Sequence, residues 1–298
     1  MQVINPATGA VIADLAADDA ASVEAKVDAA RDAQPAWAAR PLAERVEIIR
    51  KFRAMVTYRL DDLAAIMTAE TGKPIALSRN ELNGLLPRID FFLDNVVDTL
   101  APEVVLLDDD NGMEEVITQE PLGVIANISA WNYPYFVGSN VFVPGLLAGN
   151  AVVYKPSEFA SMTGQAIAEM LWGAGVPEAV FPLVIGGGEV GAALLDQRVD
   201  GVFFTGSYAT GRRIAEAMGG SMARVQLELG GKDPVYVAED VDVAIAAASL
   251  ADGAFYNNGQ SCCSVERIYV HRDIYDEFVD HFVRTVEGFT MGLSLIHI

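Results

Sequence analysis

Cysteine is almost absent from the 298-residue chain, and its two cysteines, Cys262 and Cys263, are neighbours. Adjacent cysteines cannot join distant segments, so a disulfide-stabilised scaffold is excluded and a reducing, cytoplasmic compartment is expected. Histidine is also scarce: His271, His281 and His297 lie 10 and 16 residues apart, which matches no metal-ligand spacing. We therefore predict no metal site.

Basic residues are the minority charge, with 20 Lys and Arg against 41 Asp and Glu and a formal net charge of −21. Such an acidic surface repels nucleic-acid phosphates and anionic lipid headgroups, so neither partner is expected. One long uncharged run lies between Glu120 and Lys155. It contains several asparagines together with Pro134 and Pro144, which a membrane-spanning helix does not readily accommodate. We expect this run to be a buried α/β segment.

The N-terminal third predicts a short strand followed by helices, and then a hairpin. Asn-Gly within the turn-rich segment 108–112 favours a tight connection between two strands. An acidic hairpin in this position is expected to protrude and to pair with another subunit. The predicted helices run from Asp18 or Asp19 to about Gln34, over 42–71, and over 76–99 with an interruption near Pro87; the hairpin strands are 103–107 and 115–119.

After Pro121 short apolar strands alternate with helices. This alternation is typical of a parallel sheet covered on both faces, so we predict an α/β, doubly wound, Rossmann-like fold. The expected strands are 123–128, 151–154, 181–185, 201–205, 224–229, 234–237 and 267–271, and the expected helices 161–173, 189–195, 209–218, 241–255 and 274–286.

Two glycine-containing turns between a strand and a helix are candidate phosphate-binding loops. Gly186, Gly188 and Gly191 form the pattern G-x-G-x-x-G, but no clear acidic residue follows about 20 positions later. The second turn contains Gly206 and Ser207 and continues to Gly211. Either turn alone is equally well explained as a tight connection without a ligand.

Four segments carry more specific chemistry: 129–134, 155–158, 227–232 and 258–262. Cys262 is a candidate nucleophile, because a thiolate attacks carbonyl groups. Glu228 is a candidate general base, with apolar and glycine neighbours of the kind that strengthen a carboxylate as a base. The Asn132 amide is a candidate donor to a developing oxyanion. Each residue alone also has a structural explanation. Cys262 could be a buried structural cysteine, Glu228 a carboxylate at the end of a helix or strand, and Asn132 a turn-forming asparagine. Lys155 could be a surface lysine and Glu158 a helix-capping carboxylate.

Taken together, the four motifs resemble those of the NAD(P)-dependent aldehyde dehydrogenase superfamily. Their order and spacing carry the resemblance, with 23 residues from Asn132 to Lys155 and 34 from Glu228 to Cys262. It extends from about Asn5 to about Gly292. The resemblance implies a cofactor-binding domain over 1–229 with an oligomerisation-type hairpin at about 102–120, and the first part of a second α/β catalytic domain over 230–291.

The resemblance implies the oxidation of an aldehyde to a carboxylic acid with hydride transfer to NAD(P)+. Cys262 would form a thiohemiacetal, and the Asn132 amide and the Cys262 backbone N–H would hold its oxyanion. Glu228 would activate the water that hydrolyses the thioester, and Lys155 completes the implied catalytic set. Cys263 would be a neighbour only, because the Gly-Gln-x-Cys spacing selects Cys262.

The resemblance also implies NAD as the cofactor, with NADP less favoured. A carboxylate at Glu158 would accept a hydrogen bond from a ribose 2′-hydroxyl and would repel a 2′-phosphate. Gly188 is a weaker candidate than the other cofactor-binding residues, because this family does not bind its cofactor through the usual G-x-G-x-x-G loop. The implied cofactor-binding residues are Ser129, Trp131, Asn132, Lys155, Ser157, Glu158, Gly188, Gly206, Ser207, Gly211 and Leu229.

The chain departs from the family pattern in its length, since it ends 36 residues after Cys262. We expect the C-terminal half of the catalytic domain to be missing, and residues 292–298 to be a non-native tail. One alternative is a non-catalytic NAD-binding fragment, and another is an acylating enzyme that passes the thioester to coenzyme A. Glu228 argues against the latter, because transfer to a thiol needs no water-activating base. The parent protein is expected to act on a small aldehyde and to be a homodimer or homotetramer.

Overall fold

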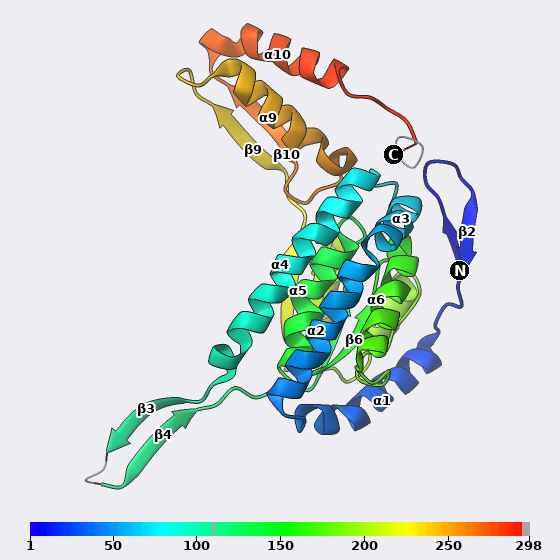
Figure 1. The fold of residues 1–298 in the computed structure, drawn as a ribbon, viewed down its shortest axis with the longest axis vertical. Helices are drawn as coiled ribbons and strands as arrows, with labels where there is room; N and C mark the ends of the chain where they lie inside the picture. Colours follow the sequence, from blue (N-terminus) through cyan, green and yellow to red (C-terminus); the bar gives the residue numbers. More distant parts are fainter. Residues whose placement is uncertain (109–110, 294–298) are drawn as a thin grey trace.

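A four-stranded parallel sheet forms the centre of the computed structural model, which describes residues 1–108 and 111–293 (Figure 1). The strand order is β6–β5–β7–β8, so β5 and β7 are neighbours at the point where the winding direction reverses. The doubly wound α/β fold predicted from the sequence is confirmed. The sheet comprises β5 (Val124–Ile128), β6 (Ala151–Lys155), β7 (Gly201–Gly206) and β8 (Arg224–Leu229).

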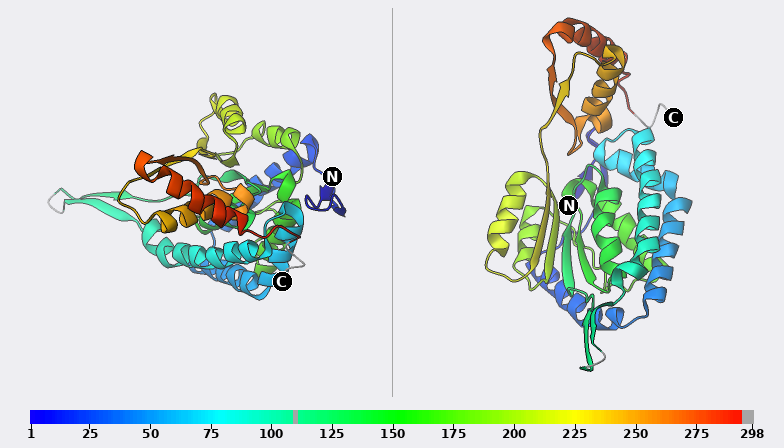
Figure 2. Two further views of the ribbon diagram at one scale, coloured as in Figure 1. Left: turned by 90° about the horizontal axis from the view of Figure 1, so that it is seen from above. Right: turned by 90° about the vertical axis from the view of Figure 1, so that its left-hand side faces the viewer.

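Helices cover both faces of this sheet (Figures 1 and 2). The helices α5 (Pro134–Leu147) and α6 (Ser161–Ala174) lie on one face, against a second layer formed by α2 (Leu42–Tyr58), α3 (Leu60–Thr71) and α4 (Ile75–Leu100). The other face carries α1 (Ala20–Ala38), α7 (Gly188–Leu195) and α8 (Tyr208–Met218). Because both faces are covered, β5 and β6 are buried along their whole length, as their unbroken apolar runs indicate.

The predicted strand over 181–185 is wrong. This segment pairs with β6 through a single bridge, Tyr154 with Leu183. The Tyr154 amide donates to the Pro182 carbonyl, and the Val184 amide donates to the Tyr154 carbonyl. Proline has no N–H, so the next rung of the ladder, from residue 182 to β6, cannot form.

Two predictions about the N-terminal helices are also wrong. The expected single helix over 42–71 is divided into α2 and α3 at Arg59, whose φ of −98° and ψ of 11° leave the helical region. The expected interruption at Pro87 does not occur, and α4 continues through it. Buried Leu85 and Ile89 flank this proline, and their burial offsets the roughly 3 kcal/mol that an interior proline costs. The expected cap of α1 is confirmed at Asp19, whose carboxylate accepts from the Ser22 amide at 2.8 Å.

The predicted hairpin is confirmed as the antiparallel pair β3 (Glu103–Asp108) and β4 (Met113–Ile117), although its second strand ends two residues early. Residues 109–110 of its turn lie outside the described residues. The hairpin projects from the body, and its apolar side chains are exposed along both strands (Figures 1 and 2). A second, shorter antiparallel pair near the N-terminus joins β1 (Gln2–Ile4) and β2 (Val11–Asp14).

A separate lobe follows β8 and lies at the opposite end of the molecule from the hairpin (Figure 2). We call residues 233–289 the C-terminal lobe. It has its own small core of Val237, Val243, Ala247 and Phe278. Its elements are β9 (Asp233–Val237), α9 (Val243–Phe255), the short 3-10 turn η2 (Tyr256–Gly259), β10 (Val265–Val270) and α10 (Tyr275–Glu287).

The division expected from the sequence, with one domain over 1–229 and a second over 230–291, remains a prediction. Of the expected non-native tail, residues 294–298 lie outside the described residues. Among the helices of the described residues, none is both long and apolar enough to cross a membrane.

Candidate active site

Most of the residues predicted to bind the cofactor lie at the carboxyl ends of β5, β6 and β7, whereas Gly188 begins α7, Gly211 lies within α8 and Leu229 ends β8. Ligands of doubly wound sheets bind at this edge, where the strand order reverses. Ser129, Trp131 and Asn132 follow β5, Ser157 and Glu158 follow β6, and Gly206 ends β7. The Ser129 amide also donates to the Lys155 carbonyl at 3.0 Å, which joins the first two of these segments.

Lys155 is buried, not on the surface as its single-residue interpretation allowed. Its Nζ donates to the Pro156 carbonyl at 3.3 Å. Burial lowers the pKa of Lys155, and the negative charges of Glu158 and Glu189 oppose that shift. An ammonium group offers three donors, so beyond this one bond the lysine can also serve a ligand hydroxyl. Lys155 therefore has donors left for a ligand at this edge of the sheet.

Ser157 and Glu158 form the turn directly after Lys155. The Ser157 hydroxyl accepts from the Phe159 amide at 3.3 Å and lies 3.3 Å from Glu158 Oε2. The Glu158 carboxylate is exposed and is therefore accessible to a ligand hydroxyl. The Trp131 ring meets the Phe159 ring edge-on at 6.3 Å, which packs the end of β5 against this turn.

The glycine-containing turns have different local roles. Ser207 caps α8, where its hydroxyl accepts from the Thr210 amide at 3.3 Å. Gly211 faces Leu229, and a Cβ at this glycine would lie 2.5 Å from Leu229 Cδ2. A side chain there would require the Leu229 side chain to shift. Gly188 begins α7 and has open space around its Cβ position. Cofactor contacts at these residues remain a prediction.

The structure brings the motifs 129–134 and 258–262 together across about 128 residues of sequence. The Asn132 Nδ2 atom donates to the Gln260 carbonyl at 3.0 Å. Buried Asn257 donates to both segments, to the Asn132 carbonyl at 3.1 Å and to the Gln260 carbonyl at 3.2 Å. The predicted oxyanion donor is therefore hydrogen-bonded to Gln260, two positions before the predicted nucleophile. The Gln260 carbonyl already accepts from its amide.

The segment that leads to Cys262 has an unusual backbone. Asn257 and Asn258 both adopt left-handed conformations, with φ of 54° and 58°. Asparagine tolerates this region better than most residues. The Asn258 side chain donates to the Gly72 carbonyl at 3.1 Å, which attaches the turn to the end of α3.

Cys262 and its neighbour Cys263 are both exposed residues with free thiols. Partial burial of the sulfur and the adjacent Cys263 thiol raise the pKa of the Cys262 thiol. A raised pKa favours the thiol over the nucleophilic thiolate at neutral pH.

Glu228 does not have the apolar surroundings expected from its sequence neighbours. It is exposed, because β8 is an edge strand with much of its surface open. Among the described residues no hydrogen bond joins Glu228 to Cys262. Their segments approach through Gly231, since a Cβ there would lie 3.9 Å from the Cys262 carbonyl oxygen. The proposed base and nucleophile are thus in neighbouring segments but are not paired.

Sequence reasoning missed a buried ion pair beside this site. Lys73 Nζ contacts Glu81 Oε2, and both side chains are only 1% exposed. Glu81 Oε1 accepts from the Tyr135 and Phe136 amides at 2.9 and 3.1 Å, in the first turn of α5. The signal in the sequence is that Glu81 falls on the apolar face of α4, four residues before Leu85 and eight before Ile89.

One cluster of possible metal ligands exists in the described part of the chain, although the histidine spacing predicted none. His271 Nε2 lies 3.3 Å from Glu239 Oε2, and Asp273 is the third member, with all three ligand atoms within 4.8 Å. The two carboxylates are exposed and the histidine is half-buried. Exposed groups of this kind commonly form ion pairs without a metal, so the cluster does not establish a metal site.

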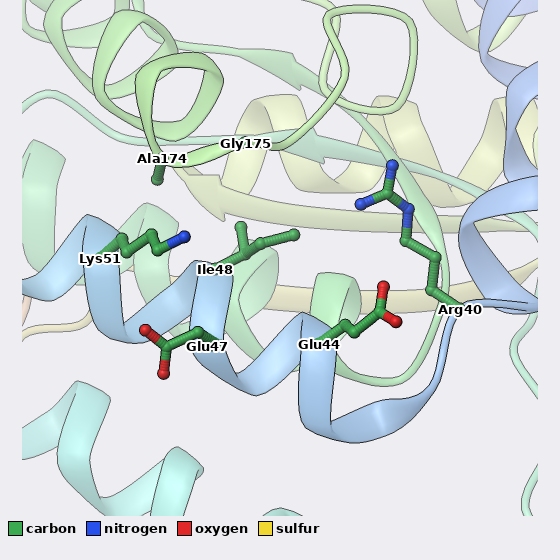
Figure 3. A pocket seen from close by; sticks show the side chains of 7 residues that line it. All are labelled: Arg40, Glu44, Glu47, Ile48, Lys51, Ala174 and Gly175. Atoms are coloured by element: carbon green, nitrogen blue, oxygen red, sulfur yellow. The ribbon is translucent and has the colours of Figure 1, made fainter.

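A surface pocket between α2 and the end of α6 contains none of the predicted site residues (Figure 3). Glu44, Glu47 and Lys51 give it walls of both charge signs. The remaining lining residues are Arg40, Ile48, Ala174 and Gly175.

Comparison with known proteins gives a consistent result. The model of the aldehyde dehydrogenase family matches residues 1–296. A relative in Mycolicibacterium smegmatis, named as a succinate-semialdehyde dehydrogenase (NADP+), is 37% identical over 278 residues. That match covers 93% of this chain but 53% of the relative, so the chain spans about half of the relative's length.

Solved structures of similar sequence superpose closely on this fold. A γ-glutamyl-γ-aminobutyraldehyde dehydrogenase from Burkholderia cenocepacia has a TM-score of 0.94 at 36% identity. An indole-3-acetaldehyde dehydrogenase in complex with NAD+ has a TM-score of 0.93 at 33% identity. Each match covers 99% of this chain and 60% of the solved chain.

Proposed function

Because the chain belongs to the aldehyde dehydrogenase family, we propose that it contributes the nucleophile, the oxyanion donor and much of the dinucleotide site of an NAD(P)-dependent aldehyde dehydrogenase. The observation that carries this proposal is the junction between Asn132 and Gln260, which brings the oxyanion-donor motif to the cysteine motif. These residue types are the ones that acyl chemistry at a thiol requires.

In the proposed reaction, the Cys262 thiol first releases its proton to solvent, and the thiolate then adds to the aldehyde carbon to give the oxyanion of a thiohemiacetal. The Asn132 amide and the Cys262 backbone N–H donate to its oxyanion, for which the amide turns away from the Gln260 carbonyl. Glu228 takes a proton from the water that hydrolyses the later thioester, and its exposure on β8 leaves it accessible to water. A reducing compartment suits this chemistry, because oxidation of Cys262 would remove the nucleophile.

A dinucleotide fits the edge of the sheet, where Lys155 is buried at the carboxyl end of β6 with the exposed Glu158 carboxylate beside it. When bound, NAD(P)+ supplies the acceptor for the hydride. Lys155 and Glu158 would hold the ribose hydroxyls on the adenine side. We propose NAD, because Glu158 would repel a 2′-phosphate, although the relative from M. smegmatis carries NADP+ in its name.

The exposed hairpin supports a proposal about assembly. Leu107 is 63% exposed and Val104 is 54% exposed, on an element that projects from the body. We propose that the hairpin packs against a second copy in the parent homodimer or homotetramer. If so, Leu107→Glu yields monomers in sedimentation experiments; an unchanged molecular mass contradicts the proposed interface.

The function is tested by mixing the chain with NAD+ and a set of small aldehydes while following the formation of NADH. Cys262→Ser should abolish NADH formation, and the matched neighbour Cys263→Ser should retain it. Binding of NAD+ without turnover by the wild-type chain supports the alternative, a non-catalytic NAD-binding protein. Coenzyme A-dependent release of the acyl group supports an acylating enzyme instead.

A further inference from the structure

The buried pair of Lys73 and Glu81 contacts the residues that directly follow Asn132, namely Tyr133, Tyr135 and Phe136. Glu81 projects from α4 and accepts from two amides in the first turn of α5. The residue before that helix, Tyr133, provides no side-chain cap of its own. The free amides of a helix N-terminus need acceptors, and here a carboxylate from another helix supplies them.

Lys73 fixes the other side of the same peptide. Its Nζ contacts Glu81 and lies 3.9 Å from the centre of the Tyr133 ring, in a cation–π arrangement. Tyr133 is bonded to Asn132, and its amide donates to Asn132 Oδ1 at 3.1 Å. The pair therefore holds both the backbone and the ring next to the proposed oxyanion donor.

The cysteine segment is attached to the same structure. Asn258 donates to the Gly72 carbonyl, directly before Lys73, and Asn257 donates to the Asn132 carbonyl. These contacts link the α3–α4 connection, the start of α5 and the turn before Cys262. If the ion pair is displaced, these contacts shift both the Asn132 segment and the Cys262 segment.

We infer that Lys73 and Glu81 are positioning residues, which hold the Asn132 amide in register with the Cys262 segment. This inference rests on the proposed function. Neither side chain touches the substrate in this arrangement, since both are buried. Their effect is exerted through the first turn of α5 and through Tyr133.

The test compares two reactions of Cys262 in the same chain. Acylation by p-nitrophenyl acetate passes through an oxyanion, whereas alkylation by iodoacetamide does not. Glu81→Gln removes the charge, and Glu81→Asp keeps the charge but shortens the side chain by one methylene. Each should lower the rate of acylation by about 10- to 100-fold, as expected for a misplaced oxyanion donor. The alkylation rate should change by less than about twofold.

Glu70 provides a matched control. It is a buried glutamate on α3 that caps α6 through the Met162 and Thr163 amides, at 2.6 and 2.9 Å. Glu70→Gln and Glu70→Asp should therefore leave the ratio of acylation to alkylation unchanged. An equal fall in that ratio for the Glu70 and Glu81 variants would mean general loosening of the fold and would overturn the inference.

Hydrogen exchange provides a readout that does not depend on catalysis. In both Glu81 variants, residues 131–137 and residues 256–262 should lose protection together. If residues 131–137 open while 256–262 stay protected, the positioning inference is wrong. The proposed function is contradicted if the wild-type chain is not acylated, or if Cys262→Ser is still acylated. In either case the hydrogen-exchange result still decides the positioning role. Normal acylation in both Glu81 variants contradicts the positioning role and leaves the proposed function standing.

Discussion

At the scale of single residues, close packing behind Lys155 constrains the proposed dinucleotide site. Gly164 on α6 faces Pro156, the residue after Lys155. A Cβ at Gly164 would lie 2.4 Å from Pro156 Cγ and 2.7 Å from Pro156 Cβ. A proline ring cannot move aside as the end of a flexible side chain can. The glycine therefore determines how closely α6 approaches the turn that follows β6.

We expect Gly164→Ala to destabilise the chain, although alanine is the better helix former. Overpacking costs about 1–3 kcal/mol, and a contact this close belongs at the upper end of that range. This cost exceeds the roughly 1 kcal/mol that alanine gains over glycine in helix propensity. Gly84, within α4 and with nothing near its Cβ position, is the matched control. Gly84→Ala should be stabilising by about 0.5–1 kcal/mol. Urea unfolding measures both, and stabilisation by Gly164→Ala would contradict the packing argument.

The sequence motifs were sufficient to propose the chemistry of single residues, but not their surroundings. Asn132, Lys155 and Cys262 can be selected because their segments have a characteristic order and spacing. The exposure of Glu228 depends on its place in an edge strand, which its neighbours in sequence do not reveal. The pairing of Lys73 with Glu81 depends on how α4 packs against α5, and the two residues carry no motif of their own.

At the scale of elements, Glu70 connects α3 to α6. Its carboxylate accepts from the Met162 and Thr163 amides and from the Thr163 hydroxyl. Burial raises the pKa of Glu70 above its ordinary value of 4.5, although these hydrogen bonds oppose the shift. The cap therefore includes a carboxyl group that keeps its proton to higher pH in the folded chain than in the unfolded chain.

This shift predicts a pH dependence of stability with a definite sign. As pH rises above 4.5, the unfolded chain releases the Glu70 proton before the folded chain does. The stabilising contribution is present below that pH and is lost as pH rises through the folded pKa. Urea unfolding from acidic to neutral pH should show wild-type stability falling relative to Glu70→Gln, which carries no titrating group. If the free energies of unfolding of the wild-type chain and Glu70→Gln change in parallel with pH, the pKa of Glu70 is not raised in the folded chain.

The existence and type of most elements were predictable because apolar periodicity marks a buried strand or helix. The exceptions involve proline, whose effect depends on its partner. Pro182 removes one donor at a sheet edge and interrupts the hydrogen-bond ladder with β6. Pro87 removes one bond within α4, where buried neighbours keep the helix intact. The residues next to each proline in sequence do not indicate whether it interrupts an edge strand or is accommodated within a buried helix.

At the scale of the whole molecule, the candidate active site lies at the junction of the body and the C-terminal lobe. The body supplies Asn132 and Lys155, whereas the lobe supplies Asn257 and Cys262. The hydrogen bonds from Asn132 and Asn257 cross this junction. The lobe is joined to β8 by the exposed residues 230–232 and has a core much smaller than that of the body.

We expect the lobe to open before the body unfolds, because few buried apolar side chains stabilise it. Phe278 is 3% exposed and stacks on Phe282 at 5.9 Å, so Phe278→Ala should cost the lobe about 3–5 kcal/mol. Hydrogen exchange should then show loss of protection over 233–289 while β5 and β6 stay protected. The Asn132 segment should become more exposed as well, because its partners Asn257 and Gln260 leave with the lobe. Equal loss of protection in β5 and β6 would show instead that the two cores unfold as one unit, and the site would then be as stable as the central sheet.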